Sequence, residues 1–289
     1  MTVTFLPKES LNMRGLNLKS EPVVSFGCTE ASGTDTPDVL HVFHAKYGPS
    51  ERLGWGPQLR LRFGYFNPDD IYEATVASLI DPSTDWLDVG CGSQVFPDNL
   101  PTAQQLSQRC QSLVGVDPSE NINDNELIHD GFRGVIEDFH TERRFDLVTL
   151  RMVAEHITSP AAAVAAFSRL LKPNGRVVIY TVFRWSPVTL LSGSTPMWVH
   201  HLLKRVIWRT EEKDTFPVTY LMNTRARLKA IFHPAGFQEE RFCYLDDCRT
   251  LARWRPTVLL ELCIWRALRF FRLHYPEVCI LGVYRKGPE

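Results

Sequence analysis

Residues 86–92 read Trp-Leu-Asp-Val-Gly-Cys-Gly, and this stretch decides the fold of the chain. Three apolar residues and an acid lead into two closely spaced glycines, a pattern typical of a buried strand that enters a ligand-binding turn. Gly90 and Gly92 tolerate the backbone angles of a sharp turn and let a ligand approach the main chain. A Gly-x-Gly turn also occurs in purely structural loops, so its meaning depends on the residues that follow.

Predicted strands and helices alternate on both sides of this turn. The predicted strands after it cover residues 112–117, 145–150, 174–183, 237–245 and 278–284. The predicted helices cover residues 68–79, 102–111, 159–172, 224–235 and 256–273. Such alternation is typical of a parallel sheet with right-handed crossovers and helices on both faces. In these sheets ligands bind at the carboxyl ends of the strands.

The bulk composition describes an ordinary globular protein. Of the 289 residues, 44% are hydrophobic and 22% are charged, and the net charge of −1 gives no general attraction to nucleic acid. We find neither a secretory signal nor an apolar run long enough to span a membrane, and we therefore expect a cytoplasmic protein. The seven cysteines lack paired CxxC spacing, so we expect reduced thiols, with no metal site and no disulfide framework.

The chain divides into a tail and one domain. Residues 1–37 are rich in Ser, Thr, Pro and Gly, which predicts a flexible N-terminal tail or an arm that wraps the body. Residues 38–289 form a single predicted domain. Residues 184–224 interrupt the alternation of strands and helices, and we expect this insertion to form a lid or a substrate-binding wall.

Five segments together resemble a known family. WLDVGCG, LVGVDPS, IEDF, FDLVTLRMVAEHI and LLKPNGRVVIYTV follow one another in the order seen in class I S-adenosylmethionine-dependent methyltransferases. Within that superfamily the chain is most similar to the ubiquinone/menaquinone-biosynthesis and small-molecule group, over about residues 62–182. The resemblance implies a Rossmann-like α/β fold. Its sheet would have seven mostly parallel strands, an antiparallel final strand, helices on both faces and a lid insertion after strand five.

The resemblance also implies S-adenosylmethionine as the cofactor and assigns residues to its site. Asp88 can accept a hydrogen bond from the ligand's ammonium group, and Asp117, which ends the next strand, can accept both ribose hydroxyls. Asp138 would accept from the adenine amino group, and Phe139 would cover one face of the ring. The implied cofactor residues are Arg62, Asp88, Gly90, Gly92, Asp117, Pro118, Asp138, Phe139 and Arg151.

Two alternatives remain open beside the methyltransferase. A nicotinamide-dependent oxidoreductase would also use an acid such as Asp117, but its fingerprint needs a third glycine where this chain has Val95. The methyltransferase pattern often has a further glycine at position 94, where this chain has Gln94. This departure puts contacts of the following loop in doubt and motivates the second alternative, a cofactor-binding scaffold without catalysis.

The candidate catalytic bases are histidines and a tyrosine. They are His156, His200, His201 and Tyr220, the last three of which lie in the insertion. His156 either removes a proton from the acceptor or only stabilises its helix. Both roles stay open, because the sequence does not show which groups surround the side chain. His200 and His201 are adjacent and would point apart on a helix, so we expect no metal there.

The insertion and the last predicted helix indicate what kind of substrate or partner the protein binds. Aromatic and aliphatic residues in 184–224 favour a hydrophobic or aromatic small-molecule acceptor, methylated on oxygen or alternatively on nitrogen or carbon. The apolar helix 256–273 either packs on the sheet or docks on a membrane or a partner subunit. Six arginines between 249 and 272 leave RNA as a further substrate class, although we expect no nucleic-acid partner. The oligomeric state stays open.

Overall fold

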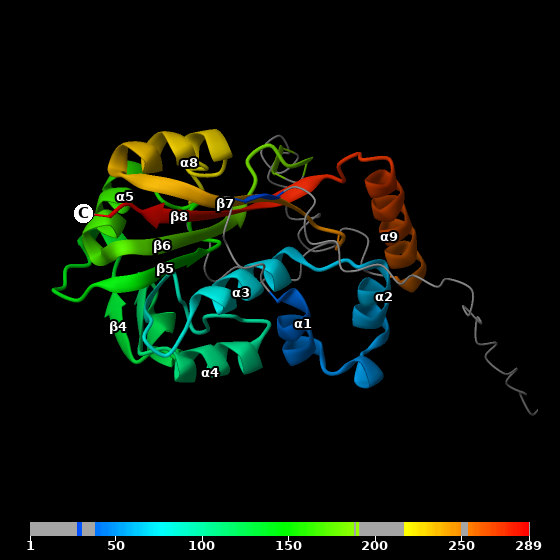
Figure 1. The fold of residues 1–289 in the computed structure, drawn as a ribbon, viewed down its shortest axis with the longest axis horizontal. Coiled ribbons are helices and arrows are strands. Elements are labelled where there is room, and N and C mark those ends of the chain that lie inside the picture. The colour runs from blue at the N-terminus through cyan, green and yellow to red at the C-terminus, as the bar shows by residue number, and fades with distance from the viewer. Residues whose placement is uncertain (1–27, 31–37, 188, 191–216, 250–253, 289) are drawn as a thin grey trace, which may run out of the picture.

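An eight-stranded sheet with helices on both faces organises the protein (Figure 1). The computed structural model describes residues 28–30, 38–187, 189–190, 217–249 and 254–288. The strands are β1 (Cys28–Glu30), β2 (Asp85–Val89), β3 (Ser112–Asp117), β4 (Asp130–Arg133), β5 (Phe145–Arg151), β6 (Leu171–Val182), β7 (Phe237–Asp246) and β8 (Glu277–Lys286). The α-helices are α1 (Val39–Tyr47), α2 (Trp55–Phe63), α3 (Pro68–Leu79), α4 (Leu100–Arg109), α5 (Pro160–Leu170), α8 (Arg225–Phe232) and α9 (Arg255–Phe270).

The strand order is β1-β7-β8-β6-β5-β2-β3-β4. Strands β2 to β6 pair in parallel, and β8 is antiparallel to both of its neighbours, β6 and β7. Because β7 is antiparallel to β8, it runs in the same direction as β6. This arrangement confirms the predicted mostly parallel sheet with an antiparallel final strand. Strand β1 adds an eighth strand at the edge.

Two apolar cores lie on opposite faces of the sheet. One core gathers side chains from α5 and α8, including Phe167 and Phe232, and the other gathers side chains from α3 and α4 around Trp86. Figure 1 shows the same division, with α5 and α8 above the strands and α3 and α4 below them. The central strands read as continuous apolar runs because both of their faces are covered.

The local sequence explains where α3, one helix of the second core, begins. Pro68 occupies the first turn of α3, where its missing N–H would have no intrahelical partner. The carboxylate of Asp70 accepts a hydrogen bond from the backbone N–H of Asn67 at 3.0 Å and completes a capping box. This start fixes the end of α3 that points toward the carboxyl edge of the sheet.

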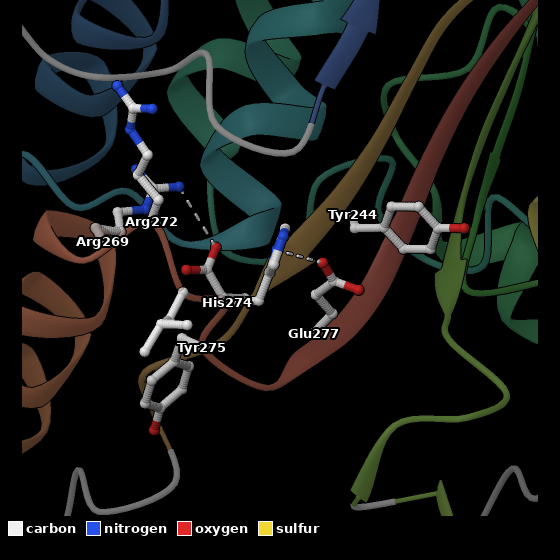
Figure 2. Close-up of a pocket in the computed structure, with 8 residues that line it drawn as sticks. Tyr244, Arg269, Arg272, His274, Tyr275 and Glu277 are labelled. Atoms are coloured by element: carbon white, nitrogen blue, oxygen red, sulfur yellow. Dashed lines mark ion pairs between the residues drawn. The ribbon is translucent and has the colours of Figure 1, made fainter.

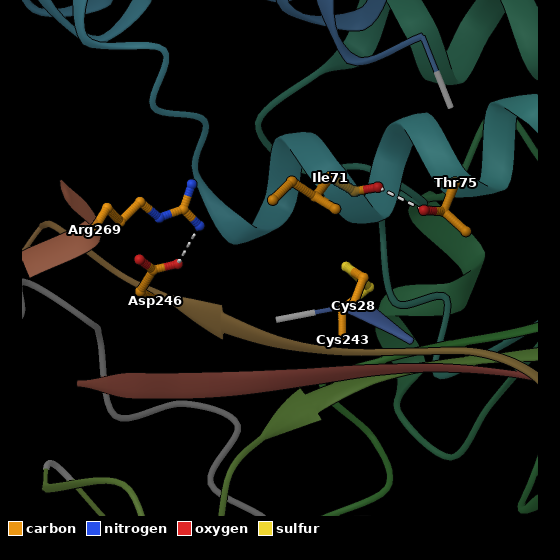
Figure 3. The surroundings of a disulfide bond; sticks show 6 residues. All are labelled: Cys28, Ile71, Thr75, Cys243, Asp246 and Arg269. Atoms are coloured by element: carbon orange, nitrogen blue, oxygen red, sulfur yellow. Dashed lines mark hydrogen bonds and ion pairs between the residues drawn. A yellow bond between two sulfur atoms is a disulfide. The ribbon is translucent and has the colours of Figure 1, made fainter. Parts of the chain in front are cut away.

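The expectation of reduced cysteines without a disulfide is wrong at one pair. Cys28 in β1 and Cys243 in β7 stand directly opposite in the strand pairing and form a disulfide bond, which lies beneath α3 (Figure 3). The two residues are 215 positions apart, so cysteine spacing in the sequence carried no sign of the pair. The bond also ties residues 28–30, which fall inside the predicted tail, to the sheet edge.

Other differences concern element boundaries and the insertion. The third parallel strand is Asp130–Arg133, and the apolar segment after it forms a 3-10 turn at Ile136–Asp138 rather than a strand. The predicted lid lies mostly outside the described residues, since only 184–187, 189–190 and 217–224 of it belong to them. Among the helices that the structure describes, none combines the length and apolar character that a membrane span requires.

Candidate functional site

The turn after β2 approaches the segment after β5 so closely that only glycine fits. Gly90 has a φ of +74°, and a Cβ built there would lie 2.1 Å from Cγ2 of Val153. Its N–H donates to the carbonyl oxygen of Val116 in β3 at 2.7 Å. Gly92 has a φ of +46°, but no atom lies within 4 Å of the place of its Cβ. Gly90 is therefore required by packing, whereas Gly92 leaves open space beside the backbone.

Asp117 at the end of β3 holds this turn in place. Its Oδ2 accepts a hydrogen bond from the N–H of Gly92 at 2.9 Å, and its Oδ1 accepts from the N–H of Ser119 at 2.7 Å. Asn125 adds a second link, because its Nδ2 donates to the carbonyl oxygens of Cys91 and Gly92 at 3.3 and 3.1 Å. Each carboxylate oxygen of Asp117 keeps a further lone pair that can accept from a ligand hydroxyl.

Asp88 lies buried one residue before the turn and takes part in a chain of hydrogen bonds. Trp86 Nε1 donates to Thr149 Oγ1 at 2.7 Å, and Thr149 Oγ1 donates to Asp88 Oδ1 at 2.6 Å. Burial raises the pKa of Asp88 to about 7, against the opposing effects of the Thr149 hydrogen bond and the Arg151 charge. A ligand cation near this carboxyl group would favour its charged form.

Arg151 is the last residue of β5 and forms an ion pair with Asp69 of α3. Its Nη2 lies 2.9 Å from Asp69 Oδ1, while Arg249 Nη1 lies 3.0 Å from Asp69 Oδ2. Burial alone would raise the pKa of Asp69, but the two guanidinium groups hold it below its usual value. Arg151 Nε is buried without a hydrogen-bond partner in the described part of the chain. The predicted cofactor residue Arg151 therefore keeps one donor for a ligand.

The predicted adenine residues lie where β4 continues into the 3-10 turn. Asp138 is exposed, whereas the ring of Phe139 is buried and packs against Phe132 at a centroid distance of 5.2 Å. Phe139 thus belongs to the apolar core on the α5 and α8 side of the sheet. Its predicted contact with the face of an adenine ring stays a prediction. Pro118 is exposed directly after Asp117. Arg62 is exposed on α2, and its predicted cofactor role also stays a prediction.

Two candidate bases meet around Glu155. The backbone carbonyl of Glu155 accepts hydrogen bonds from the N–H groups of Thr219 and Tyr220 at 2.7 and 3.2 Å. His156 Nδ1 donates to the carbonyl oxygen of Pro217 at 3.1 Å, which leaves Nε2 as the basic nitrogen of the neutral ring. Burial and the nearby Glu155 raise the pKa of Tyr220, which disfavours its phenolate form. The predicted roles of His156 and Tyr220 as bases stay predictions.

The Glu155 side chain points into a second buried network. Thr181 Oγ1 in β6 donates to Glu155 Oε2 at 2.6 Å, and Asn223 Nδ2 donates to Thr181 Oγ1 at 2.8 Å. Burial raises the pKa of Glu155. This network joins β5, β6 and residues 217–223 beside the carboxyl edge of the sheet.

Several supporting residues carried no sequence signal of their role. Asp69, Thr149 and Asn125 contact the predicted site residues from segments that are distant in sequence. No sequence motif marked these three residues. His200 and His201 lie outside the described residues. Within the described ranges, no group of three metal-ligating side chains is present.

These features fit a nucleoside-type ligand without phosphates. Gly92 leaves space beside the turn, Asp117 presents a carboxylate at the end of β3, and Asp88 supplies a buried acid near the same backbone. Val95, where a dinucleotide site has glycine, is buried in the core next to α3 and α4. The strand order and this turn define a class I methyltransferase fold, and the predicted cofactor residues Asp88 and Asp117 lie at the carboxyl ends of β2 and β3.

Comparison with known families agrees with this fold. A family model described as a methyltransferase domain matches residues 60–240, which is more than half of the chain. The chain therefore belongs to the methyltransferase domain family, and its cofactor is S-adenosylmethionine.

Curated relatives match part of the chain. A ubiquinone biosynthesis O-methyltransferase of Pseudomonas paraeruginosa is 29% identical over 129 residues, 41% of this chain and 53% of the relative. A protein of the same name from Leptothrix cholodnii is 28% identical over 154 residues, 48% of this chain and 62% of the relative. The chain spans about half to three fifths of the length of these relatives. A structural match to the solved N-methyltransferase NodS from Bradyrhizobium japonicum, in complex with S-adenosyl-l-homocysteine, includes 87% of this chain and 99% of the NodS chain. The sequence identity of this match is 14% and its TM-score is 0.45.

Alanine at the two turn glycines should separate packing from ligand space. Both positions have positive φ, which costs an L-residue roughly 1–2 kcal/mol. Gly90→Ala additionally clashes with Val153, so its free energy of unfolding should fall well below that of Gly92→Ala in urea titrations. Gly92→Ala should instead weaken S-adenosylmethionine binding in calorimetry. The double variant Gly90→Ala/Val153→Ala should be more stable than Gly90→Ala alone, because the clash is removed. Equal free energies of unfolding for Gly90→Ala and Gly92→Ala would contradict the packing argument.

Cofactor affinity should depend on pH through Asp88. Below its pKa of about 7 this carboxyl group is protonated and neutral, and above it the group carries the charge that attracts the cofactor ammonium. The affinity should therefore fall as the pH is lowered through this range, approaching about tenfold per pH unit at the acidic end. Calorimetric titrations across pH measure the slope. Asp88→Asn should bind weakly with a flat profile, and an unchanged slope in this variant would refute the assignment.

Proposed function

We propose that the chain transfers the methyl group of S-adenosylmethionine to an oxygen atom of a hydrophobic or aromatic small molecule. The observation that carries this proposal is the Gly90–Gly92 turn joined to the Asp117 carboxylate, with Val95 packed in the core instead of a third glycine. The names of the partial relatives, ubiquinone biosynthesis O-methyltransferases, support oxygen as the acceptor atom.

The chain's residues would bind the cofactor and orient the acceptor. S-adenosylmethionine, when bound, supplies an electrophilic methyl group on a sulfonium. Asp117 would accept from the ribose hydroxyls, and Asp88 would bind the ammonium group. Holding donor and acceptor in line in a dry pocket can lower the barrier by roughly 7–11 kcal/mol. The protein's main task is thus positioning, together with removal of the acceptor proton.

His156 is the residue that we propose for this proton. Its Nδ1–H is engaged with the Pro217 carbonyl, so Nε2 presents a lone pair. Nε2 would accept the O–H proton of the acceptor, so that the hydroxyl oxygen could take the methyl group that S-adenosylmethionine would supply and the cofactor would leave as the neutral thioether. A base of this kind contributes typically 10²–10⁴-fold to a rate.

Label transfer tests the proposed reaction. We expect the full chain, incubated with S-adenosylmethionine carrying a labelled methyl group and an extract of phenols and lipids, to move label into the organic phase. Tandem mass spectrometry and NMR spectroscopy of the labelled product would then identify the acceptor atom. Asp117→Ala serves as the control and should lose the transfer. Cofactor binding without any transfer would favour the scaffold alternative, whereas binding of NAD in place of S-adenosylmethionine would favour the oxidoreductase.

Replacement of His156 tests its role as a base. His156→Gln can still donate a hydrogen bond toward Pro217 but is a far weaker base, so kcat should fall by roughly 10²-fold or more. Cofactor affinity should stay near the wild-type value in calorimetry. If His156→Gln keeps the wild-type kcat, the side chain only holds residues 217–223.

A further inference from the structure

The outward side of α9 is apolar along its whole length. Leu260, Ile264 and Phe271 are spaced four and seven residues apart, which places them on one stripe of the helix. Their side chains are 54%, 43% and 69% exposed. The exposed apolar face consists of Leu260, Cys263, Ile264, Ala267, Phe270 and Phe271. A soluble helix normally buries such a stripe against its own protein.

The charged residues of α9 lie instead on its inner side and flanks. Glu261 is buried and accepts a hydrogen bond from the Tyr275 hydroxyl at 2.7 Å. Arg266 Nη1 donates to the carbonyl oxygen of Phe63 in α2 at 3.0 Å. Arg269 Nη2 lies 3.9 Å from Asp246 Oδ1, and Figure 3 shows the two side chains facing each other. Arg269 also lines the pocket between the end of α9, the end of β7 and the start of β8 (Figure 2). The inner side of the helix is anchored by these polar contacts and by the buried Leu262 and Trp265, so the exposed apolar face is a second apolar surface that points outward.

The charge of this end of the molecule points to the kind of partner. Helices α2 and α9 pack together beyond the carboxyl edge of the sheet (Figure 1) and carry five arginines against one glutamate, the buried Glu261. Arg62 and Arg255 are exposed here, and Arg272 is exposed just after α9. Two of the five arginines pair with acids of other elements, Arg60 with Asp70 and Arg269 with Asp246. The exposed arginines are therefore the ones that place positive charge at the rim of the exposed apolar face.

These two features together fit an anionic bilayer. Arginines at the rim can remain at the headgroups while the apolar stripe enters the boundary of the acyl chains. Exposed aromatic residues stand at both ends of the stripe, Trp254 at the start of α9 and Phe270 at its end, as in membrane-interface belts. A second copy of the chain would bring like charges together, because a two-fold interface pairs the same surface with itself.

We propose that the apolar face of α9 docks the protein on anionic membranes. Only side chains that already point to solvent enter the bilayer, so the helix keeps its anchors on α2 and β7. The proposal concerns an interaction surface and does not depend on the methyl-transfer reaction.

Sedimentation with lipid vesicles tests the surface. The full chain should sediment with phosphatidylglycerol–phosphatidylcholine vesicles and far less with phosphatidylcholine alone. Ile264→Asp/Phe271→Asp should lower the partition coefficient by roughly tenfold or more, because two apolar anchors are lost. Leu100→Asp is the matched control, since Leu100 is also 43% exposed but lies on α4, and it should sediment like the wild type.

A second pair of variants tests the role of charge. Arg255→Gln/Arg272→Gln should reduce the preference for anionic vesicles by about fivefold for each arginine. Circular dichroism of every variant would establish that the fold is kept. Absence of wild-type sedimentation at low salt, or unchanged sedimentation of Ile264→Asp/Phe271→Asp, would overturn the proposal. Self-association that these aspartates abolish, without vesicle binding, would overturn it in favour of a dimer.

Discussion

The carboxylate of Asp117 satisfies two turns of the chain at once. One oxygen accepts from the N–H of Gly92 after β2, and the other accepts from the N–H of Ser119 after β3. Parallel strands place their ends side by side, and these bonds join the two ends into one rigid edge. Without them, two amides near a buried carboxylate would lose their partners, at a cost of about 1–3 kcal/mol for each buried group. The geometry of the Gly90–Gly92 turn therefore depends on this carboxylate.

Two further buried acids extend this edge in opposite directions. Asp69 connects α3 to Arg151 at the end of β5 and to Arg249 after β7, and Glu155 connects β5 to β6 through Thr181. Asp69 is neutralised by two cations and stays ionised, whereas burial raises the pKa of Glu155. Both arrangements satisfy a buried carboxyl group, which an apolar interior otherwise penalises. Among the described residues, polar links between elements therefore border the candidate site.

Sequence patterns predicted the site features that lie within one short segment and missed the contacts between distant segments. The turn of Gly90 and the acid at Asp117 were predictable because strand, glycine and acid stand within one short segment each. The Cys28–Cys243 bond and the Asp69–Arg151 pair were not, since strand register and helix placement bring those residues together over long separations. Phe139 shows a further limit, because its position was predicted but its ring packs on Phe132 in the core.

The last helix shows why composition alone left two interpretations open. Apolar residues cover most of its circumference, so either side could have been buried. The side that packs on the protein combines the buried Leu262 and Trp265 with the inward hydrogen bonds of Glu261 and Arg266. Helix α9 leaves the carboxyl end of β7 and returns to the start of β8, beyond the edge that carries the Gly90 turn. A bilayer at α9 would thus adjoin the same edge as the predicted cofactor residues. A hydrophobic acceptor leaving that bilayer would reach the edge over a short path, which links the two proposals through geometry.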